Sequence, residues 1–599
     1  MKNTILKNVV LIIMAWLFAI CIKSCFAIEA DAQLFYTNSV LSVMIFLIYF
    51  YFIKKATEEE KWLTIKSYLT VSSVFCFFFF GAMISGVQLD LYGRVNFTDI
   101  NLYLTLLVLT LTAAPIVAWI MNSLYAKTKI NCIEEMPAGR KYFLKVYFIL
   151  ILSYLLVLLA AWPGFFSYDA ETETHMAFTD NYSAHHPMAH VLLLGWIMKI
   201  MYKIIPSYNV GIAVYLFLQI LVVAACFSYM ITFMKKIGVK KWIINVGIIF
   251  LALFPTVSMF VCCTTKDIYF SAGVTLFTTL LLELAKYGES FWKSKLKSIL
   301  IVLSALLILL FRNNGLYAFV VFLPFLVIVY KKYWKTWLKL IAIVAVTYIL
   351  FNVSVNAIFD VVPGEKKEML CVPMQQLARA YIEEKDSFTE EELETLYSLI
   401  PEPILNNYNP KLADNIKVNF LEDNFFSEPE KYVSLWFETG KKHPDVYVNS
   451  FLMNTYGYWY PDTIIDGYTG KKIVNREYGE SSYFAFETER PGISKPLIPF
   501  LAKFYEKISL EIYQQKAPVL SMLFSMGFWL WTYIFAMIYL LKTKNKKQAF
   551  AFLPIGIIYL TVILGPIAIV RYVLYLYFCV PLIFGLLLNT KAFAEKEQI

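Results

Sequence analysis

Long apolar runs alternate with short polar loops over most of the chain, and this pattern predicts its architecture. About 20 consecutive apolar residues can cross a bilayer as a helix, and short cytoplasmic loops collect Lys and Arg. On this basis we expect an all-α polytopic membrane protein with about fourteen transmembrane helices and both termini inside. The expected spans cover residues 8–28, 37–53, 67–87, 100–122, 142–161, 208–233, 243–261, 268–285, 298–311, 316–330, 338–358, 519–541, 549–565 and 573–588.

One further apolar run, at 188–205, is not counted among the spans. If it crossed the membrane, Lys240 and Lys241 would lie outside, and every later basic loop would be inverted. Lys199 and Lys203 lie four residues apart, so both can extend to the headgroups from one face of a helix. We therefore predict that 188–205 lies in the outer interface without crossing.

Composition agrees with a membrane protein. The 599 residues are 59% hydrophobic, and the mean hydropathy is +0.61, which excludes an ordinary soluble protein. The net charge of +9 does not indicate nucleic-acid binding, because the basic residues gather in loops between spans while the segment 360–516 is acidic. Most of the nine cysteines lie in apolar runs, so no disulfide framework is expected.

The apolar runs divide the chain into four predicted segments. These are an N-terminal four-helix membrane segment (1–130), a core (131–359) with an outer loop at 162–207, an extracytoplasmic domain (360–516) and a C-terminal three-helix membrane segment (517–599). The extracytoplasmic domain is expected to be mainly helical. Thr389 and Glu392 form a capping box that opens one helix, and a second helix should open at Ser427 and end near Gly440.

The loop at 162–187 concentrates ionisable groups beside an expected helix end. Four of the five histidines lie within or just after it, together with four acids: His175, His185, His186, His190, Asp169, Glu171, Glu173 and Asp180. Such a concentration in a membrane protein favours a functional site. A carboxylate beside apolar walls, as expected for Asp169, keeps a raised pKa and can act as a base near neutral pH. Alternatively, the acids face water, and His185 and His186 cap the following helix.

Three cations stand at the expected outer ends of apolar runs: Lys266, Arg312 and Arg571. Together they suit a lipid-linked phosphate, because Arg can bind two phosphate oxygens at once. Arg312 taken alone fits equally well an ordinary arginine that extends to the headgroups. The aromatic residues at 456–460 could stack on a sugar, or they could pack the outer domain onto the membrane.

These residues carry a resemblance to a known superfamily. Tyr168, Asp169 and Glu171, followed by His186-Pro187 and an interfacial helix, resemble the first outer loop of the C-fold (GT-C) glycosyltransferases. Protein O-mannosyltransferases and aminoarabinose transferases belong to that superfamily. Arg571-Tyr572 with Pro581 resembles an Arg-Tyr…Pro pattern in late helices of such enzymes.

The resemblance covers roughly 142–358 as a seven-helix core and the later part more loosely. The whole arrangement looks closest to an uncharacterised branch of large membrane proteins from low-GC bacteria. Two departures concern the mannosyltransferase pattern: Ala170 separates the two acids, and Met188 stands where a second proline is usual. These departures argue against peptide specificity of the mannosyltransferase kind.

The resemblance implies a membrane glycosyltransferase that moves a sugar from a polyprenyl-phosphate donor to a cell-envelope glycan, lipid or protein. The active site would lie on the extracytoplasmic face of the bacterial plasma membrane, in contact with lipids and not with nucleic acid. Asp169 would be the base or a metal ligand, and Glu171 and His186 would orient it or the acceptor. Lys266, Arg312 and Arg571 would hold the phosphate.

Several further roles follow from the same expectation. The candidate acceptor or sugar contacts are His185, His190, Asn313, Asn314, Tyr458 and Trp459. A divalent metal, Mg²⁺ or Mn²⁺, stays open as a cofactor, with Asp169 and Asp267 as candidate ligands. The sugar, the acceptor, the stereochemical outcome and the oligomeric state stay open as well.

Three alternatives stand beside the transferase. A transporter or flippase of lipid-linked sugars would carry charged residues inside its spans along a central path. An envelope polysaccharide polymerase or ligase would use the same class of lipid-linked substrate. A structural scaffold would explain neither the histidine cluster nor the three cations.

Overall fold

The computed structural model describes residues 2–26, 40–130, 138–464, 472–473, 476–477, 488–510, 517 and 519–593. Helices make up nearly all of its secondary structure. Within the described residues the strands are Lys472–Ile473 (β1) and Arg476–Glu477 (β2), which pair antiparallel. The prediction of a helical protein is therefore confirmed.

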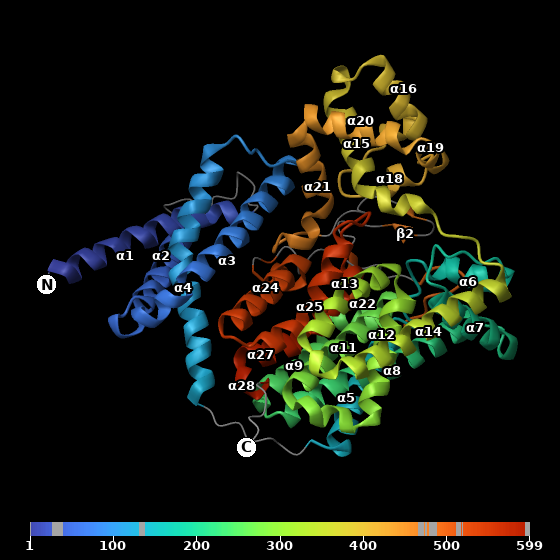
Figure 1. Ribbon diagram of the computed structural model, residues 1–599, viewed down its shortest axis with the longest axis horizontal. Coiled ribbons are helices and arrows are strands. Elements are labelled where there is room, and N and C mark those ends of the chain that lie inside the picture. Colours follow the sequence, from blue (N-terminus) through green and yellow to red (C-terminus); the bar gives the residue numbers. More distant parts are fainter. Residues whose placement is uncertain are drawn as a thin grey trace. The chain divides into compact units, whose positions relative to one another are not determined.

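The chain forms two compact units, and each is built from separate stretches of sequence (Figure 1). Unit 1 comprises Met1–Asn131, Leu370–Thr463 and Val519–Lys544. Unit 2 comprises Cys132–Met369, Ile464–Pro518 and Asn545–Ile599. These units cut across the predicted segments, because 360–516 is divided between them.

The α-helices of unit 1 are α1 (Lys2–Cys21), α2 (Val40–Ala56), α3 (Glu59–Tyr92), α4 (Ile100–Ile130), α15 (Cys371–Glu384), α16 (Glu390–Leu399), α17 (Glu402–Leu405), α18 (Asp414–Lys417), α19 (Glu422–Ser427), α20 (Pro429–Lys442), α21 (Pro444–Trp459) and α24 (Met526–Lys542). Those of unit 2 are α5 (Arg140–Ala160), α6 (Ala170–Thr179), α7 (Met188–Ile204), α8 (Tyr208–Lys236), α9 (Lys241–Leu253), α10 (Pro255–Val261), α11 (Asp267–Tyr287), α12 (Lys295–Phe311), α13 (Asn313–Val329), α14 (Trp334–Phe359), α22 (Pro499–Leu510), α25 (Lys546–Val562), α26 (Leu574–Phe578), α27 (Val580–Leu588) and α28 (Thr590–Phe593).

Each predicted span overlaps one or two of these helices. Among the described residues, eight helices are long and apolar enough to cross a membrane, or nine if the bent pair α9 and α10 counts as one span. The two halves of that pair meet at 53°, where Pro255 begins the second helix. Shorter apolar helices include α13 and α24. The structure is that of a helical protein suited to several membrane crossings, and the total of fourteen stays a prediction.

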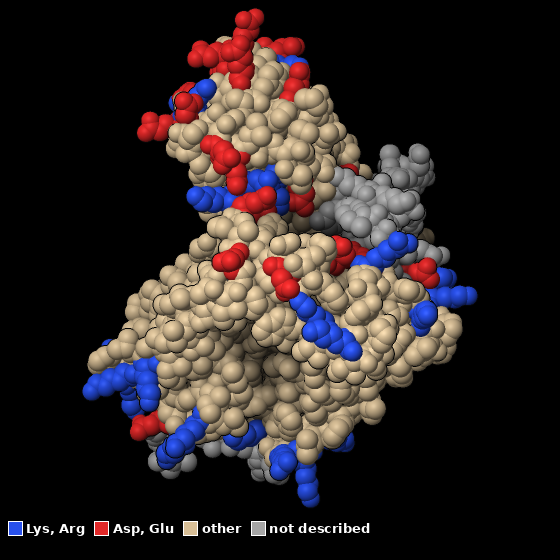
Figure 2. All heavy atoms as spheres, turned by 90° about the vertical axis from the view of Figure 1, so that its right-hand side faces the viewer, with Lys and Arg blue, Asp and Glu red and all other residues tan. Residues whose placement is uncertain are grey.

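Unit 1 combines long apolar helices with a smaller helical part that has its own core. The predicted capping box is present, because Thr389 Oγ1 accepts a hydrogen bond from the Glu392 N–H at 3.2 Å at the start of α16. Behind it, Leu396 and Leu399 are buried against Met374 of α15. Figure 2 shows acidic side chains gathered over this helical part.

Helix α11 runs through the middle of unit 2. Every residue from Asp267 to Lys286 is buried, and α8, α12 and α25 pack along it (Figure 1). Two of its hydroxyls are satisfied within the helix, since Thr275 donates to Ser271 O at 2.8 Å and Thr279 donates to Thr275 O at 2.7 Å. This burial places the polar start of α11 inside the protein.

The opposite pattern holds for α14. Its large apolar side chains are exposed along much of its length, among them Leu338, Val346, Ile349 and Val353. Figure 2 shows the corresponding face of unit 2 as a broad surface with few charged side chains. An exposed apolar surface of this extent fits contact with lipid tails.

Two glycines allow close approaches between helices near the candidate site. A Cβ at Gly195 of α7 would overlap the Ala177 side chain of α6, and a Cβ at Gly315 of α13 would overlap the Ile308 carbonyl of α12. Glycine is therefore required where α6 packs on α7 and where α12 turns into α13.

Replacement of Gly195 tests the first of these contacts. The Gly195→Ala variant should be destabilised by about 1–3 kcal/mol, because the added methyl group forces α6 away from α7. Thermal unfolding of the detergent-purified protein measures this. The control is Gly81→Ala, where nothing lies within 4 Å of the added Cβ, and it should be neutral or stabilising. Identical unfolding temperatures for Gly195→Ala and wild type would contradict the packing described.

Labelling with a membrane-impermeant thiol reagent tests the predicted topology. A cysteine at position 240, in the α8–α9 loop, should react only from the inside of sealed vesicles. A cysteine at position 199, on α7, should not react from the inside. Reaction of position 240 from the outside would show that the topology is inverted from α8 onwards.

Candidate functional site

Two segments that are distant in sequence lie side by side beneath the site. Phe165 and Cys263 form a parallel bridge, in which Phe165 N donates to Cys262 O and Thr264 N donates to Phe165 O, each at 3.0 Å. Ser167 N also donates to Thr264 Oγ1 at 3.3 Å. This pairing brings the start of α6 beside the start of α11.

Asp169, immediately before α6, is the acid on which two cations converge. Its Oδ2 accepts hydrogen bonds from Lys266 Nζ at 2.7 Å and from Arg571 Nη1 at 2.9 Å. Its side chain stays 28% exposed, so it can meet a bound molecule. The preceding Tyr168 has a positive φ of 65°, and its ring lies 4.5 Å from the Arg571 guanidinium. Backbone strain of this kind is concentrated at functional sites.

The pKa of Asp169 moves in the direction opposite to the one predicted. Burial raises it, but the charges of Arg571 and Lys266 outweigh burial and hold the pKa well below its usual range. The prediction of a raised pKa is therefore wrong for the site as it stands. Asp169 can act as a base only if something draws these two cations away.

A second ion pair adjoins the first. Asp267 is fully buried; its Oδ1 pairs with Arg312 Nη1, and its Oδ2 accepts a hydrogen bond from Thr265 Oγ1 at 2.8 Å. The same Oδ2 lies 3.7 Å from Arg571 Nη1. Arg571 therefore bridges Asp169 and Asp267.

Arg312 occupies the break between α12 and α13 and is fixed by its neighbours. Its Nε donates to Asn314 Oδ1 at 3.0 Å, and its guanidinium lies 4.3 Å from the Tyr572 ring. Asn314 donates in turn to Thr561 Oγ1 at 2.8 Å. The Arg312 guanidinium is thus held by residues from α13, from α25 and from the segment just before α26.

Glu173 is the buried acid of α6. It lies on the helix face that also buries Ala170, Thr174 and Ala177, so it points into unit 2. Its Oε2 pairs with His190 Nδ1, and its Oε1 lies 3.6 Å from Lys266 Nζ. Burial raises the pKa of Glu173, but His190 and Lys266 bring it below its usual value.

A hydrogen-bond chain continues behind Glu173. His190 Nε2 lies 2.7 Å from Tyr215 Oη, Tyr215 donates to Gln219 Oε1 at 3.2 Å, and Gln219 Nε2 donates to Val261 O at 2.9 Å and to Cys263 O at 2.8 Å. Only the amide NH₂ of Gln219 can donate to two carbonyls, which fixes Tyr215 as a donor to Oε1. Tyr215 must then accept from His190.

This chain also fixes the charge of the Glu173–His190 pair. Because Nε2 of His190 donates to Tyr215, a further proton is shared between Nδ1 and the Glu173 carboxyl group. The pair is thus neutral as a whole. Three cations, Lys266, Arg312 and Arg571, then face the two carboxylates Asp169 and Asp267 within the described part of the cluster.

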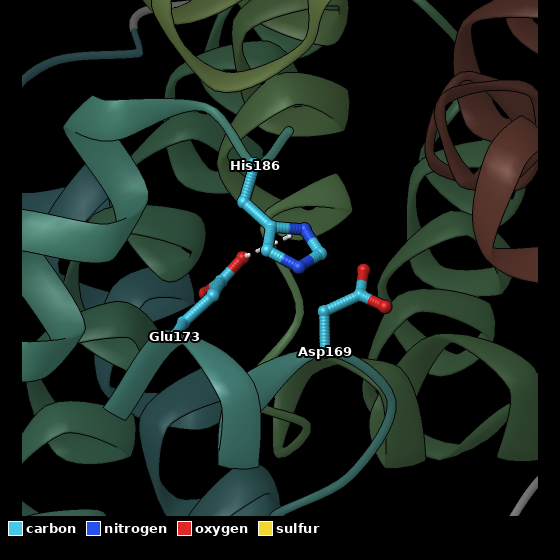
Figure 3. A group of neighbouring side chains, drawn as sticks. All are labelled: Asp169, Glu173 and His186. Carbon is cyan, nitrogen blue, oxygen red and sulfur yellow. Dashed lines mark ion pairs between the residues drawn. The ribbon is translucent and has the colours of Figure 1, made fainter. Parts of the chain in front are cut away.

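His186 lies between the carboxyl groups of Asp169 and Glu173 (Figure 3). Its Nδ1 is 3.1 Å from Lys266 Nζ and 3.9 Å from Glu173 Oε1. Burial and the Lys266 charge lower the pKa of His186 to about 4. His186 is therefore neutral at pH 7, and its Nδ1 accepts a hydrogen bond from the ammonium group.

Most sequence-predicted site residues of unit 2 meet in one cluster. Asp169, His186, His190, Lys266, Arg312, Asn314 and Arg571 belong to it, and Asp267 lies beside them. Glu171 is partly exposed and has no ion pair among the described residues. His185 and Asn313 are exposed.

Tyr458 and Trp459 belong to α21 of unit 1. Tyr458 is buried there, and Trp459 Nε1 donates to Thr455 Oγ1 at 3.1 Å. Their proposed contact with a sugar stays a prediction.

Sequence reasoning missed the site roles of Glu173, Tyr215 and Gln219. Helical spacing could have identified Glu173, because it follows Asp169 by four residues and shares a face with the small residues Ala170 and Ala177. Tyr215 and Gln219, also four apart, lie within a long apolar helix where no local pattern distinguishes them.

The question of a metal centres on Asp169, Glu173 and His186. One ligand atom from each lies within 4.8 Å of the others, which is close enough to hold an ion. The Lys266 ammonium, however, already lies against all three. As arranged, these residues do not fit a divalent metal. Asp267 is not part of this group, because its oxygens are held by Arg312 and Thr265.

One protein-family model matches more than half of the chain. The chain belongs to a family of unknown function (DUF6020), whose model matches residues 173–598. The match includes Glu173, His186, Lys266, Arg312 and Arg571, and begins after Asp169. No curated protein and no solved structure matches the chain.

The depressed pKa of His186 predicts how stability depends on pH. The pKa of His186 is about 4 in the folded protein and about 6.5 in an unfolded chain. Between these values the unfolded state binds more protons, so stability falls as pH falls from 6.5 to 4. The loss should amount to about 3 kcal/mol, at 1.36 kcal/mol per pKa unit.

Thermal unfolding between pH 4 and 7 measures this effect in the wild type and in His186→Asn. The variant should lack this part of the pH dependence, because asparagine does not titrate in the range. Parallel pH profiles for the two proteins would contradict a buried, neutral His186.

Proposed function

We propose that unit 2 is a membrane glycosyltransferase of the C-fold class, acting on the outer face of a bacterial plasma membrane. It would transfer a sugar from a polyprenyl-phosphate-linked donor to a cell-envelope acceptor. The observation that carries the proposal is the convergence of Lys266, Arg312 and Arg571 on one cluster around Asp169 and Asp267.

The chemistry of these cations supports a phosphate ligand. Arg571 and Lys266 share a single oxygen of Asp169, so a bound anion would compete with this one carboxylate for both cations. An anionic phosphate would be attracted by all three cations. The exposed apolar side chains of unit 2, such as those of α14, suit contact with lipid, from which a polyprenyl carrier would approach.

The low pKa of Asp169 suggests the order of events. In the resting site its two cations make Asp169 a weak base. A donor phosphate that attracts Arg571 and Lys266 removes that stabilisation, and the pKa of Asp169 then rises towards its ordinary value. Donor binding would thus activate the base.

In the transfer step one bond to the sugar forms and another breaks. The acceptor hydroxyl oxygen attacks the anomeric carbon of the sugar, and the bond from that carbon to the phosphate oxygen breaks. The hydroxyl proton passes to Asp169, and the polyprenyl phosphate leaves with the electron pair. Because protonated Asp169 no longer competes for Arg571 and Lys266, both cations can stabilise the phosphate as its negative charge grows.

Glu173 and His186 would position the groups that react. Glu173 and neutral His186 hold the Lys266 ammonium at 3.6 Å and 3.1 Å, which orients it towards Asp169. These positioning roles replace the one expected of Glu171, which points away from the buried face of α6.

Replacement of Asp169 tests the proposed transferase and distinguishes it from a transporter of lipid-linked sugars. Asp169→Asn keeps size and some hydrogen bonding but removes the proton acceptor, so turnover should fall on the order of 100-fold or more. Transfer from a synthetic polyprenyl-phosphate sugar by the purified protein measures this. The matched control is Asp180→Asn, which alters a 68%-exposed acid of the same loop and should leave turnover unchanged. Normal turnover in Asp169→Asn would exclude the proposed base.

Replacement of Arg312 tests the donor site. Arg312→Lys keeps the charge but loses the two-pronged guanidinium and its contact with Asn314, so donor binding should weaken by about 10-fold or more. Titration of the donor should show a raised KM with a smaller change in kcat. An unchanged KM would place Arg312 outside the donor site.

A further inference from the structure

The Lys266 ammonium lies where three potential metal ligands meet. Its Nζ is 2.7 Å from Asp169 Oδ2, 3.1 Å from His186 Nδ1 and 3.6 Å from Glu173 Oε1. One ligand atom from each of the three residues lies within 4.8 Å of the others. The lysine side chain is only 13% exposed and comes from the residue immediately before α11, so it approaches from a fixed position.

The ligands have the chemistry of a metal site as well as its spacing. Two carboxylate oxygens and one imidazole nitrogen form a set that binds divalent first-row metals such as Co²⁺, Mn²⁺ and Zn²⁺. Glu173 Oε1 is buried and takes no hydrogen bond among the described residues. It is directed at a cation, and in this structure the nearest cation is the lysine ammonium.

We propose that Lys266 is the resident cation of this three-ligand site and occupies the position that a divalent metal ion would otherwise take. Asp169, Glu173 and His186 then form a cation site that selects the ammonium of its own chain. Removal of that ammonium should convert the site into one that binds a divalent metal.

Charge explains why the Lys266 ammonium and a divalent metal ion exclude each other. Arg571 already lies 2.9 Å from the Asp169 oxygen that Lys266 contacts. A divalent ion within the site would stand a few ångströms from both side-chain charges, at a strongly unfavourable electrostatic energy. Without the lysine, the Arg571 side chain is the one remaining charge of the two, and the atoms of Asp169, Glu173 and His186 that faced the ammonium become available to an incoming ion.

This inference deepens the proposed function, because it names the cation that would stabilise a departing phosphate. Its test nevertheless needs no turnover. Failure of metal binding and failure of sugar transfer are therefore separate outcomes.

The experiment is a titration of Co²⁺ into the purified full-length protein, followed by its visible d–d absorption. Lys266→Ala and Lys266→Met should each bind one Co²⁺ ion, at least about 100-fold more tightly than the wild type, because a nearby positive charge is gone. Two variants are used because alanine leaves a larger space. Thermal unfolding identifies which of them is folded.

Two controls assign the metal to this site. Adding Glu173→Gln to either variant should abolish the absorption band, because a ligand is lost. Lys199→Ala removes a lysine that pairs with the exposed Asp180, and it should bind Co²⁺ no better than the wild type.

Three results would overturn the proposal. One is a folded Lys266 variant that binds no Co²⁺, and another is a band that survives Glu173→Gln. The third is a wild-type protein that binds Co²⁺ as tightly as the Lys266 variants. The wild-type titration tests the proposal even if neither variant folds, because a wild type that binds one Co²⁺ ion, with a band that Glu173→Gln abolishes, would show that Lys266 does not occupy the site.

Discussion

The candidate site depends on one interaction, the shared hold of Lys266 and Arg571 on a single oxygen of Asp169. It joins the loop before α6, the start of α11 and the beginning of the last helices, which are far apart in sequence. The parallel pairing of Phe165 with Cys263 brings the first two together. The burial of α11 in unit 2 then fixes where its polar first turn lies.

Buried ion pairs of this kind contribute little net stability, because desolvation of both partners offsets their attraction. Their role here is to fix the positions of the charged groups and to respond to a bound anion. Arg571 Nη1 lies 2.9 Å from Asp169 and 3.7 Å from Asp267, so a bound anion would compete with both carboxylates for the same guanidinium. The charges of Arg571 and Lys266 hold the pKa of Asp169 well below its usual range, so its carboxylate does not readily take up a proton.

The sequence was sufficient for those features that depend on local pattern. Apolar runs located the helices, Thr389 and Glu392 located a capping box, and the three cations of the cluster were recognised from their positions at helix ends. Features that depend on distant contacts could not be obtained in this way. The sequence predicts the pKa of Asp169 in the wrong direction because it suggests apolar neighbours for this carboxylate. In the structure, two cations from distant segments contact it instead.

The choice between Glu171 and Glu173 has a similar physical origin. Both acids lie in one polar loop of the sequence, and only the helical phase of α6 turns Glu173 inward towards His190. The division into two units is less predictable still. It depends on contacts between segments such as Leu370–Thr463 and the N-terminal helices, which no local pattern records.

The central claim is that this cluster acts on a polyprenyl-phosphate-linked sugar. Its most direct test is mass spectrometry of lipid-linked sugars and envelope glycans in a strain that lacks the protein. The account predicts that a polyprenyl-phosphate sugar accumulates and that one glycan loses that sugar, with both effects reversed by the wild-type protein. An unchanged set of lipid-linked sugars and glycans would contradict it.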